Sequence, residues 1–263
     1  MEKEKENKKE LLRIAIDGPG GAGKSTIAKL LAKDLGIDYV DTGAMYRAIA
    51  LKMFREGLAA EENEALAEML ARTEVDLDEG KILLDGEDVS GLIRTQEVSM
   101  MASASSALGA VRRKLVALQK AMGERKSLVM DGRDIGTNVL PQAEYKFYIT
   151  AAAEERARRR YLELQEKGQE ADYEQVLREI NERDYNDMHR ELDPLRKADD
   201  ALEIDTTKMS IDEVLAAVKA KSGMKRPETA MRYRGSPGQS RADRRPHVHP
   251  LAYTGTYRHG NSG

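Results

Sequence analysis

A phosphate-binding loop pattern near the start of the chain constrains the fold more than any other feature. Gly18 is followed by four residues and then by Gly23-Lys24-Ser25, which is the complete pattern of a loop that holds polyphosphates. A short apolar run, residues 12–16, precedes the loop, and residues 26–35 carry apolar side chains at helical spacing. Strand, loop and helix therefore follow in the order that such a loop needs, which predicts an α/β fold.

The residue types of this loop suit the phosphates of ATP with Mg²⁺. Glycines let backbone N–H groups turn inward around a polyphosphate, and the helix that follows directs its positive end at the same anion. Lys24 is expected to reach the β- and γ-phosphates and the Ser25 hydroxyl to hold Mg²⁺, with Thr26 as the alternative metal contact. The predicted ATP-binding residues of the loop are Gly18, Pro19, Gly20, Gly21, Ala22, Gly23, Lys24, Ser25 and Thr26.

The composition excludes several classes of protein. The 263 residues include no cysteine, which excludes disulfide frameworks and thiolate metal sites. No apolar run approaches the roughly 20 residues that span a bilayer, and we expect a cytoplasmic protein with no membrane partner. Aromatic residues make up 5% and Trp is missing, which argues against a stacking surface for single-stranded nucleic acid in the core.

The two ends of the chain differ in composition from the body. Residues 221–263 carry nine Lys or Arg against two Asp or Glu, whereas the whole chain has a net charge of −3. This basic, proline-rich composition predicts a disordered tail over 223–263. The tail is a candidate for contact with RNA, and a protein that binds RNA through it is the alternative from a different functional class. Residues 1–11 mix Lys and Glu and are predicted to be a flexible N-terminus.

Between these ends, short apolar runs alternate with helical patterns. This alternation predicts a five-stranded parallel sheet with flanking helices. The five expected strands are residues 12–17, 37–41, 127–131, 145–150 and 201–205. Ligands of such sheets bind beyond the carboxyl ends of the strands, and most of these runs end in polar or acidic residues.

Two segments interrupt the alternation. Residues 75–78, 81–84 and 87–89 are short strand patterns, with Asp78-Glu79-Gly80 and Asp85-Gly86 as turns. They predict a small antiparallel β insert within residues 60–100. Two charged helical patterns, 153–167 and 173–188, meet at Gly168 between core strands, and predict a lid over about 153–190. Solvated helix faces with i,i+4 ion pairs are the alternative for these charges.

Arginines and carboxylates follow the predicted strands and end the lid. The segments 41–47, 133–134 and 183–190 all combine guanidinium groups with Asp residues. Transfer between two phosphates requires such groups, because the repulsion between two polyanions has to be cancelled before they can lie in line. The chain lacks the Asn-Lys-x-Asp pattern that recognises guanine, which argues against a GTPase and favours a small-molecule kinase.

Residues 12–220 resemble the bacterial cytidylate kinase family. Five blocks carry the resemblance: residues 16–26, 41–47, 86–98, 131–137 and 183–190. The resemblance implies a P-loop nucleoside monophosphate kinase domain over 12–222, with residues 60–100 as its nucleoside-binding insert. It implies an enzyme that converts ATP and CMP or dCMP to ADP and the nucleoside diphosphate, and we expect a monomer. An adenylate- or uridylate-type kinase is the near alternative.

The resemblance also implies roles for individual side chains. The implied cytosine-recognising set is Thr42, Arg112 and Asp134. The implied monophosphate contacts are Arg47, Arg133 and Arg190, and the implied ribose pair is Arg183 and Asp187. Arg159 and Arg160 lie where the family's lid covers ATP. The implied catalytic residues are Lys24, Arg133, Asp187 and Arg190.

Simpler interpretations of four of these positions stay open at the level of sequence. Arg183 and Asp187 are four residues apart and could form a surface ion pair of little energetic value. Asp41 could cap the helix that follows it, and Arg112, beside Arg113, could be solvated. Asp131 is a candidate for orienting the water shell of Mg²⁺, as acidic residues after apolar strands do in other phosphate-loop enzymes.

Overall fold

The structure is a computed structural model that describes residues 11–78 and 80–222. The predicted flexible N-terminus, apart from its last residue, lies outside the described residues, as do Glu79 and the predicted basic tail. Within the described ranges, no helix is both long and apolar enough to cross a membrane.

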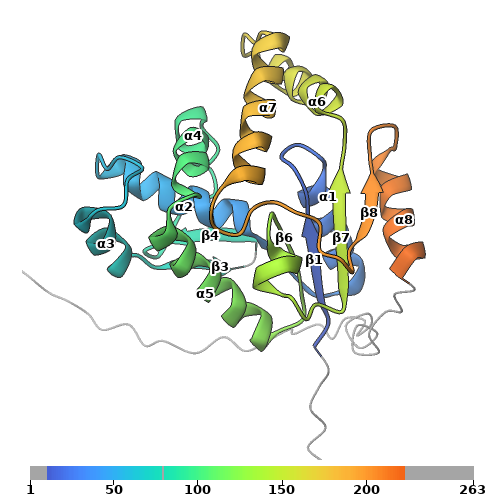
Figure 1. The fold of residues 1–263 in the computed structure, drawn as a ribbon, viewed down its shortest axis with the longest axis horizontal. Coiled ribbons are helices and arrows are strands. Elements are labelled where there is room, and N and C mark those ends of the chain that lie inside the picture. Colours follow the sequence, from blue (N-terminus) through green and yellow to red (C-terminus); the bar gives the residue numbers. More distant parts are fainter. Residues whose placement is uncertain (1–10, 79, 223–263) are drawn as a thin grey trace, which may run out of the picture. The chain divides into compact units, whose positions relative to one another are not determined.

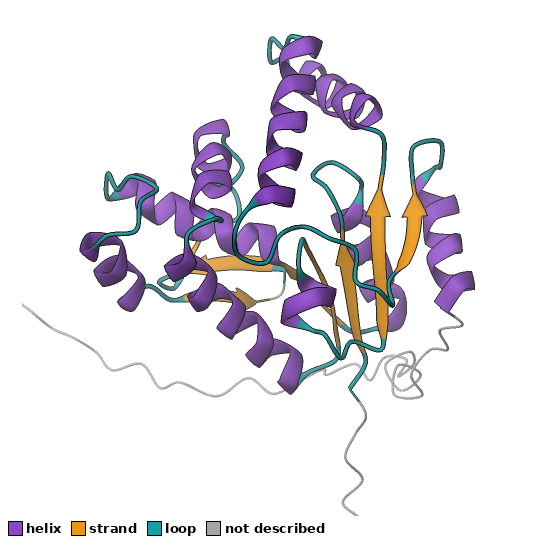
Figure 2. Ribbon diagram, viewed as in Figure 1, coloured by secondary structure: helices purple, strands orange, loops and turns teal. Residues whose placement is uncertain are grey.

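A five-stranded, fully parallel sheet forms the centre of the described chain, which confirms the predicted fold class (Figures 1 and 2). Its strands follow the order β2-β6-β1-β7-β8. Their bounds are Arg13–Asp17 for β1, Asp38–Asp41 for β2, Leu128–Gly132 for β6, Tyr145–Thr150 for β7 and Leu202–Asp205 for β8. The central β1 pairs with β6 on one side and β7 on the other, so that the phosphate loop starts in the middle of the sheet.

Alternating side chains of β1 separate two apolar layers. Ile14 and Ile16 pack into one cluster with α1 (Lys24–Leu35) and α8 (Ile211–Ser222). Ala15 packs into the other with α2 (Thr42–Arg55), α4 (Gln96–Ser105) and α5 (Gly109–Arg125). Because successive strand residues point to opposite faces, a run that is apolar on both faces demands helices on both sides of the sheet.

The predicted antiparallel insert is present as a three-stranded sheet. It contains β3 (Val75–Asp78), β4 (Lys81–Leu84) and β5 (Glu87–Asp88) in that order. Asp85 and Gly86, with φ of 50° and 83°, make the turn from β4 to β5, and positive φ at both positions suits a hairpin of this length. Lys52 of α2 donates to the Asp85 carboxylate over 2.6 Å, which ties the insert to α2.

One helix of this region was not predicted. Helix α3 (Glu64–Ala71) precedes the small sheet, and its buried residues Leu66, Met69 and Leu70 follow helical spacing. The Asn63 side chain accepts from the Leu66 N–H and caps this helix. The predicted strands of the insert begin only at residue 75, but the Asn63 cap and the spacing of the apolar residues after it are a helix signal in the sequence.

Two helices that contact each other stand beyond the carboxyl end of β7 (Figure 1). They are α6 (Ala153–Glu166) and α7 (Tyr173–His189), and Gly168 between them has a φ of 69°. Both lie in the chain between β7 and β8, at the position predicted for the lid. After β6, the chain forms a short π-helix, η1 (Ile135–Val139).

Candidate functional site

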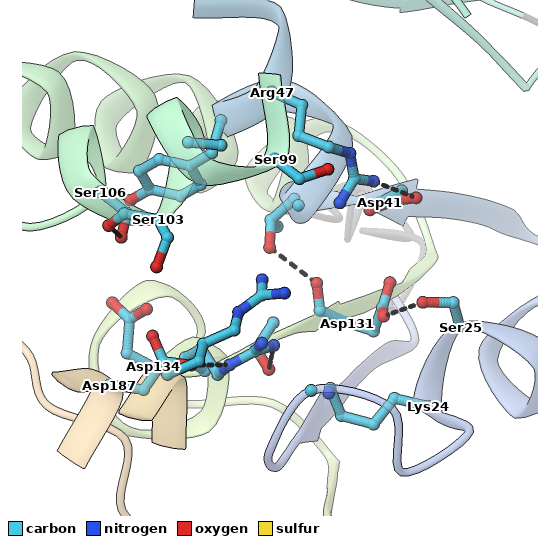
Figure 3. Close-up of a pocket in the computed structure, with 18 of the residues that line it drawn as sticks. Lys24, Ser25, Asp41, Arg47, Ser99, Ser103, Ser106, Asp131, Asp134 and Asp187 are labelled. Carbon is cyan, nitrogen blue, oxygen red and sulfur yellow. Dashed lines mark hydrogen bonds and ion pairs between the residues drawn. The ribbon is translucent and has the colours of Figure 1, made fainter. Parts of the chain in front are cut away.

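A pocket of about 210 Å³ lies beyond the carboxyl ends of β1, β2 and β6, where α4 and α7 also contribute to its walls (Figure 3). The lining brings together segments that are far apart in the chain. The predicted site residues in it are Gly20, Gly21, Lys24, Ser25, Thr42, Arg47, Arg133, Asp134, Arg183, Asp187 and Arg190. The other predicted loop residues, Gly18, Pro19, Ala22, Gly23 and Thr26, form the frame of the loop outside this lining.

The phosphate loop begins at a position that only glycine can occupy. Gly18 has a φ of 143°, and an added Cβ would lie 1.9 Å from the Ile149 carbonyl oxygen of β7. The chain can therefore leave β1 and pass close to β7 only without a side chain there. Helix α1 begins at Lys24, two residues earlier than the sequence pattern indicated.

Lys24 is a buried amine, and no carboxylate of the described residues is hydrogen-bonded to it. Its Nζ donates to the Pro19 carbonyl over 2.7 Å, back across the loop. Burial and, after it, the neighbouring Arg133 guanidinium lower the pKa of Lys24, and Asp131 acts in the opposite direction; together they bring this pKa to about 7. An anion bound in the loop would favour the charged form of Lys24, because its negative charge offsets the cost of burying the ammonium group.

Ser25 and Asp131 lie side by side at the edge of the pocket (Figure 3). The Ser25 hydroxyl donates to one carboxylate oxygen of Asp131 over 2.7 Å, and Tyr39 donates to the other over 2.9 Å. Burial raises the pKa of Asp131, and the nearby Asp41 raises it further. Thr26 is exposed, so that Ser25 is the hydroxyl facing this carboxylate. Tyr39 was missed, although its place two residues before Asp41 puts it on the same face of β2.

Asp134 lies in the floor of the pocket between two arginines. Its carboxylate accepts from Arg112 over 2.5 Å and from Arg190 over 3.2 Å. The Arg112 side chain is 2% exposed, which contradicts the alternative of a solvated residue. Asp193, which bonds Arg112 over 3.0 Å, was missed because it has a φ of 46° in an irregular segment that carries no pattern.

The Asp187 carboxylate pairs with Arg133, and not with Arg183 four residues earlier on the same helix. The Arg133 Nε donates to Asp187 over 2.7 Å, and Asp187 is 8% exposed. Burial alone would raise the pKa of Asp187, but the Arg133 charge and hydrogen bond outweigh it and hold the pKa below its usual value. The alternative of a surface ion pair with Arg183 is therefore wrong for Asp187. Arg183 lines the same pocket from α7.

Asp41 both caps α2 and faces the pocket. One of its oxygens accepts from the Ala44 N–H over 2.8 Å, and the other lies 3.5 Å from Arg47. The Arg47 Nε atom is buried, and it has no hydrogen-bond partner within residues 11–78 and 80–222. Arg47 therefore retains donor capacity at the pocket that the protein itself does not use.

Comparison with known proteins identifies the chain's relatives. The family model described as cytidylate kinase matches residues 14–222, most of the chain. The chain belongs to the cytidylate kinase family. A cytidylate kinase of Caldicellulosiruptor saccharolyticus is 55% identical over 211 residues, covering 79% of this chain and 93% of the relative. One of Bacillus subtilis is 49% identical over 219 residues, covering 80% and 98%.

Two predicted lid residues lie outside the pocket of this cytidylate kinase family member. Arg159 bonds Glu155 over 2.9 Å and the Thr206 carbonyl over 2.8 Å, whereas Arg160 pairs with Glu163 at the surface. The lid arginine that contacts the phosphate loop is Arg156. It is 4% exposed and had no signal that set it apart within a run of arginines.

Helix α4 and its C-cap residue Ser106 supply hydroxyl groups that are not among the predicted site residues. Ser99, Ser103 and Ser106 line the pocket across from Asp187 (Figure 3). Their spacing of four and three residues places them on one face of a helix, and this spacing was the available signal. Kinases of this kind normally use a divalent metal ion, and Ser25 and Asp131 place a hydroxyl and a carboxylate side by side at the phosphate loop.

Proposed function

We propose that this protein transfers the γ-phosphate of ATP to CMP or dCMP and releases ADP with CDP or dCDP. The observation that carries this proposal is the Asp134 carboxylate, 5% exposed, in the same pocket as the phosphate loop. A carboxylate accepts from the exocyclic amine of cytosine. Uracil presents a carbonyl there, which the carboxylate repels. Arg112 and Arg190 both pair with Asp134 and hold its carboxylate in place.

The cations of the pocket divide between the two phosphate groups. Lys24 and the N–H groups of residues 18–26 would bind the phosphates of ATP, and Arg47, Arg133 and Arg190 would bind the monophosphate. Asp187 orients Arg133 and, with Arg183, is assigned to the ribose. Such pre-positioned cations cancel the repulsion between the two anions and stabilise the charge of the transferred group. Arg159 and Arg160 could cover ATP only after their present bonds break.

The residues around Ser25 fit Mg²⁺. This ion prefers oxygen ligands and is usually bound through one or two protein oxygens together with substrate phosphates. Ser25 supplies a hydroxyl and Asp131 a carboxylate, and Tyr39 fixes the orientation of that carboxylate. Held by Ser25 and Asp131 together with ATP, Mg²⁺ would supply positive charge that partly neutralises the phosphates during transfer. We also propose that the insert, lid and tail have the boundaries predicted from the sequence. The protein is further proposed to be monomeric and cytoplasmic.

A panel of nucleoside monophosphates tests the proposed function. With ATP as donor, we expect ADP to form fastest with CMP and dCMP, slowly with UMP, and not with AMP. The preference follows from Asp134, which finds a donor on cytosine and a second acceptor on uracil. The measurement is a coupled assay of ADP formation at equal concentrations of each acceptor. Activity on AMP alone would overturn the proposal, as would equal rates with CMP and UMP.

Phosphate binding at Lys24 should be coupled to proton uptake. Because the pKa of Lys24 is lowered to about 7 in the free protein, this amine is mostly neutral at pH 8, and an anionic phosphate raises its pKa again. We expect Mg·ADP binding at pH 8 to be accompanied by net proton uptake, and by far less uptake at pH 6. Calorimetric titrations in two buffers of different protonation enthalpy measure this uptake. The same uptake at both pH values would contradict a role for Lys24.

A further inference from the structure

Asp17 ends β1 directly before the phosphate loop and has no part in the mechanism proposed above. Its side chain is buried, and each carboxylate oxygen accepts one backbone N–H. The donors are Ile135, over 2.8 Å, and Gly136, over 2.7 Å. Both belong to the first turn of η1. A carboxylate that accepts two N–H groups fixes the direction of that segment more firmly than a neutral acceptor would.

The segment held by Asp17 carries two of the residues proposed to bind CMP. Arg133 and Asp134 lie directly before Ile135, between the end of β6 and the start of η1. In the sheet, Asp17 is paired with Gly132, so that the same two strand ends set the starting point of both loops. The bonds from Asp17 therefore link the strand that leads into the phosphate loop with the backbone that presents Arg133 and Asp134.

The surroundings of Asp17 contain charges of both signs. Asp134 raises its pKa and Lys24 lowers it, while Lys146 and Tyr148 approach from β7. Burial is the largest influence and raises the pKa of Asp17 to about 6, although the two N–H donors act against it. Space is also restricted, because a Cβ on Gly136 would lie 3.3 Å from a carboxylate oxygen of Asp17.

We propose that Asp17 is a positioning residue that holds the loop carrying Arg133 and Asp134 in the geometry that binds CMP. The inference rests on the proposed function. Asp17 bonds the loop after β6 and not the phosphate-loop backbone. Loss of its carboxylate should therefore weaken CMP binding far more than ATP binding.

Steady-state kinetics of Asp17→Asn test the inference. The amide keeps the size of the side chain but can accept only through its oxygen, so that one N–H loses its partner. At pH 7.5 we expect the KM for CMP to rise by about tenfold and the KM for ATP by less than about twofold. The control is Asp205→Asn, since Asp205 also ends a strand and accepts the Thr207 N–H over 2.9 Å. It should leave both KM values unchanged.

The pH profile separates positioning from a general loss of structure. Between pH 7.5 and 5.5, Asp17 of the wild type becomes protonated, and its new O–H cannot accept from the backbone. The ratio of KM for CMP between variant and wild type should therefore fall toward one at pH 5.5. Taking the ratio cancels the titration of the CMP phosphate. A ratio that stays constant, or an equal rise in both KM values, would overturn the inference.

Gly136→Ala provides a second variant if Asp17→Asn fails to fold. The added methyl group presses on Asp17 without changing the charge. We expect a raised KM for CMP with the acid dependence of the wild type retained, and an unchanged KM would count against the inference. If the wild type does not turn over CMP at all, the proposed function falls as well. If it does, and both variants match it, only the role of Asp17 is refuted.

Discussion

Replacing Lys24 by Met should lower kcat by on the order of 10³ while leaving the free energy of unfolding unchanged or higher. Met has similar length and no charge, so that the transferred phosphate loses its buried cation. The folded protein meanwhile no longer pays for desolvating an amine whose pKa is lowered to about 7. The opposite directions of the two effects are typical of a residue kept for activity at the expense of stability. ADP formation and urea unfolding of the same preparation measure both.

Lys33→Met is the matched control for this variant. Lys33 lies in the last turn of α1 and is exposed, so that the same substitution on the same helix should change neither kcat nor stability by much. A Lys24→Met protein with kcat within about tenfold of the wild type would contradict the proposed role. So would a loss of activity that merely follows a loss of folded protein.

Removal of Asp134 should have the second-largest effect. We expect Asp134→Ala to lower kcat/KM for CMP by a factor that corresponds to roughly 2–4 kcal/mol of lost transition-state binding, because the cytosine amine then meets no acceptor. The variant should also be destabilised by about 3–5 kcal/mol, since Arg112 and Arg190 lose a shared buried counter-ion. Kinetics with CMP and chemical denaturation measure the two losses separately.

Asp134→Asn distinguishes base recognition from stability. The amide fills the same space and can donate as well as accept, so that the preference for CMP over UMP should shrink even where the protein stays folded. Asp199→Ala, at an exposed position, is the control and should leave this preference intact. An unchanged ratio of CMP to UMP turnover in Asp134→Asn would refute recognition by this carboxylate.

The parts of the fold that depend on local pattern were predictable. Gly18 to Thr26 could be identified because the loop needs those residue types in that order, and the five strands because apolar runs of that length alternate with helices. The order of the strands was not predictable. It depends on β6 entering between β2 and β1, a pairing between residues about 90 positions apart in the chain that no local pattern records.

Within the site, the sequence predicted which residues lie there better than it predicted which of them bond to one another. Arg112 and Arg113 are identical neighbours, and only the packing of α5 buries the first of them beneath Asp134. Resemblance to a family selected Arg112, whereas spacing could not. The contact of Asp193 with Arg112 arises from tertiary proximity alone. The spacing of Tyr39 from Asp41 indicates its face of β2, but its bond to Asp131 of β6 depends on the pairing of the two strands.

Arg156 of α6 bonds both to α7 and to the phosphate loop. From α6, its guanidinium donates to the Gly20 carbonyl over 3.1 Å and to the Ala151 carbonyl over 2.9 Å, and it pairs with Asp184 of α7 over 2.6 Å. A planar guanidinium holds its bonding directions rigidly. A tilt of either helix must therefore pull on the Gly20 peptide or break a bond of the Arg156 guanidinium, which couples the orientation of α6 and α7 mechanically to the shape of the loop.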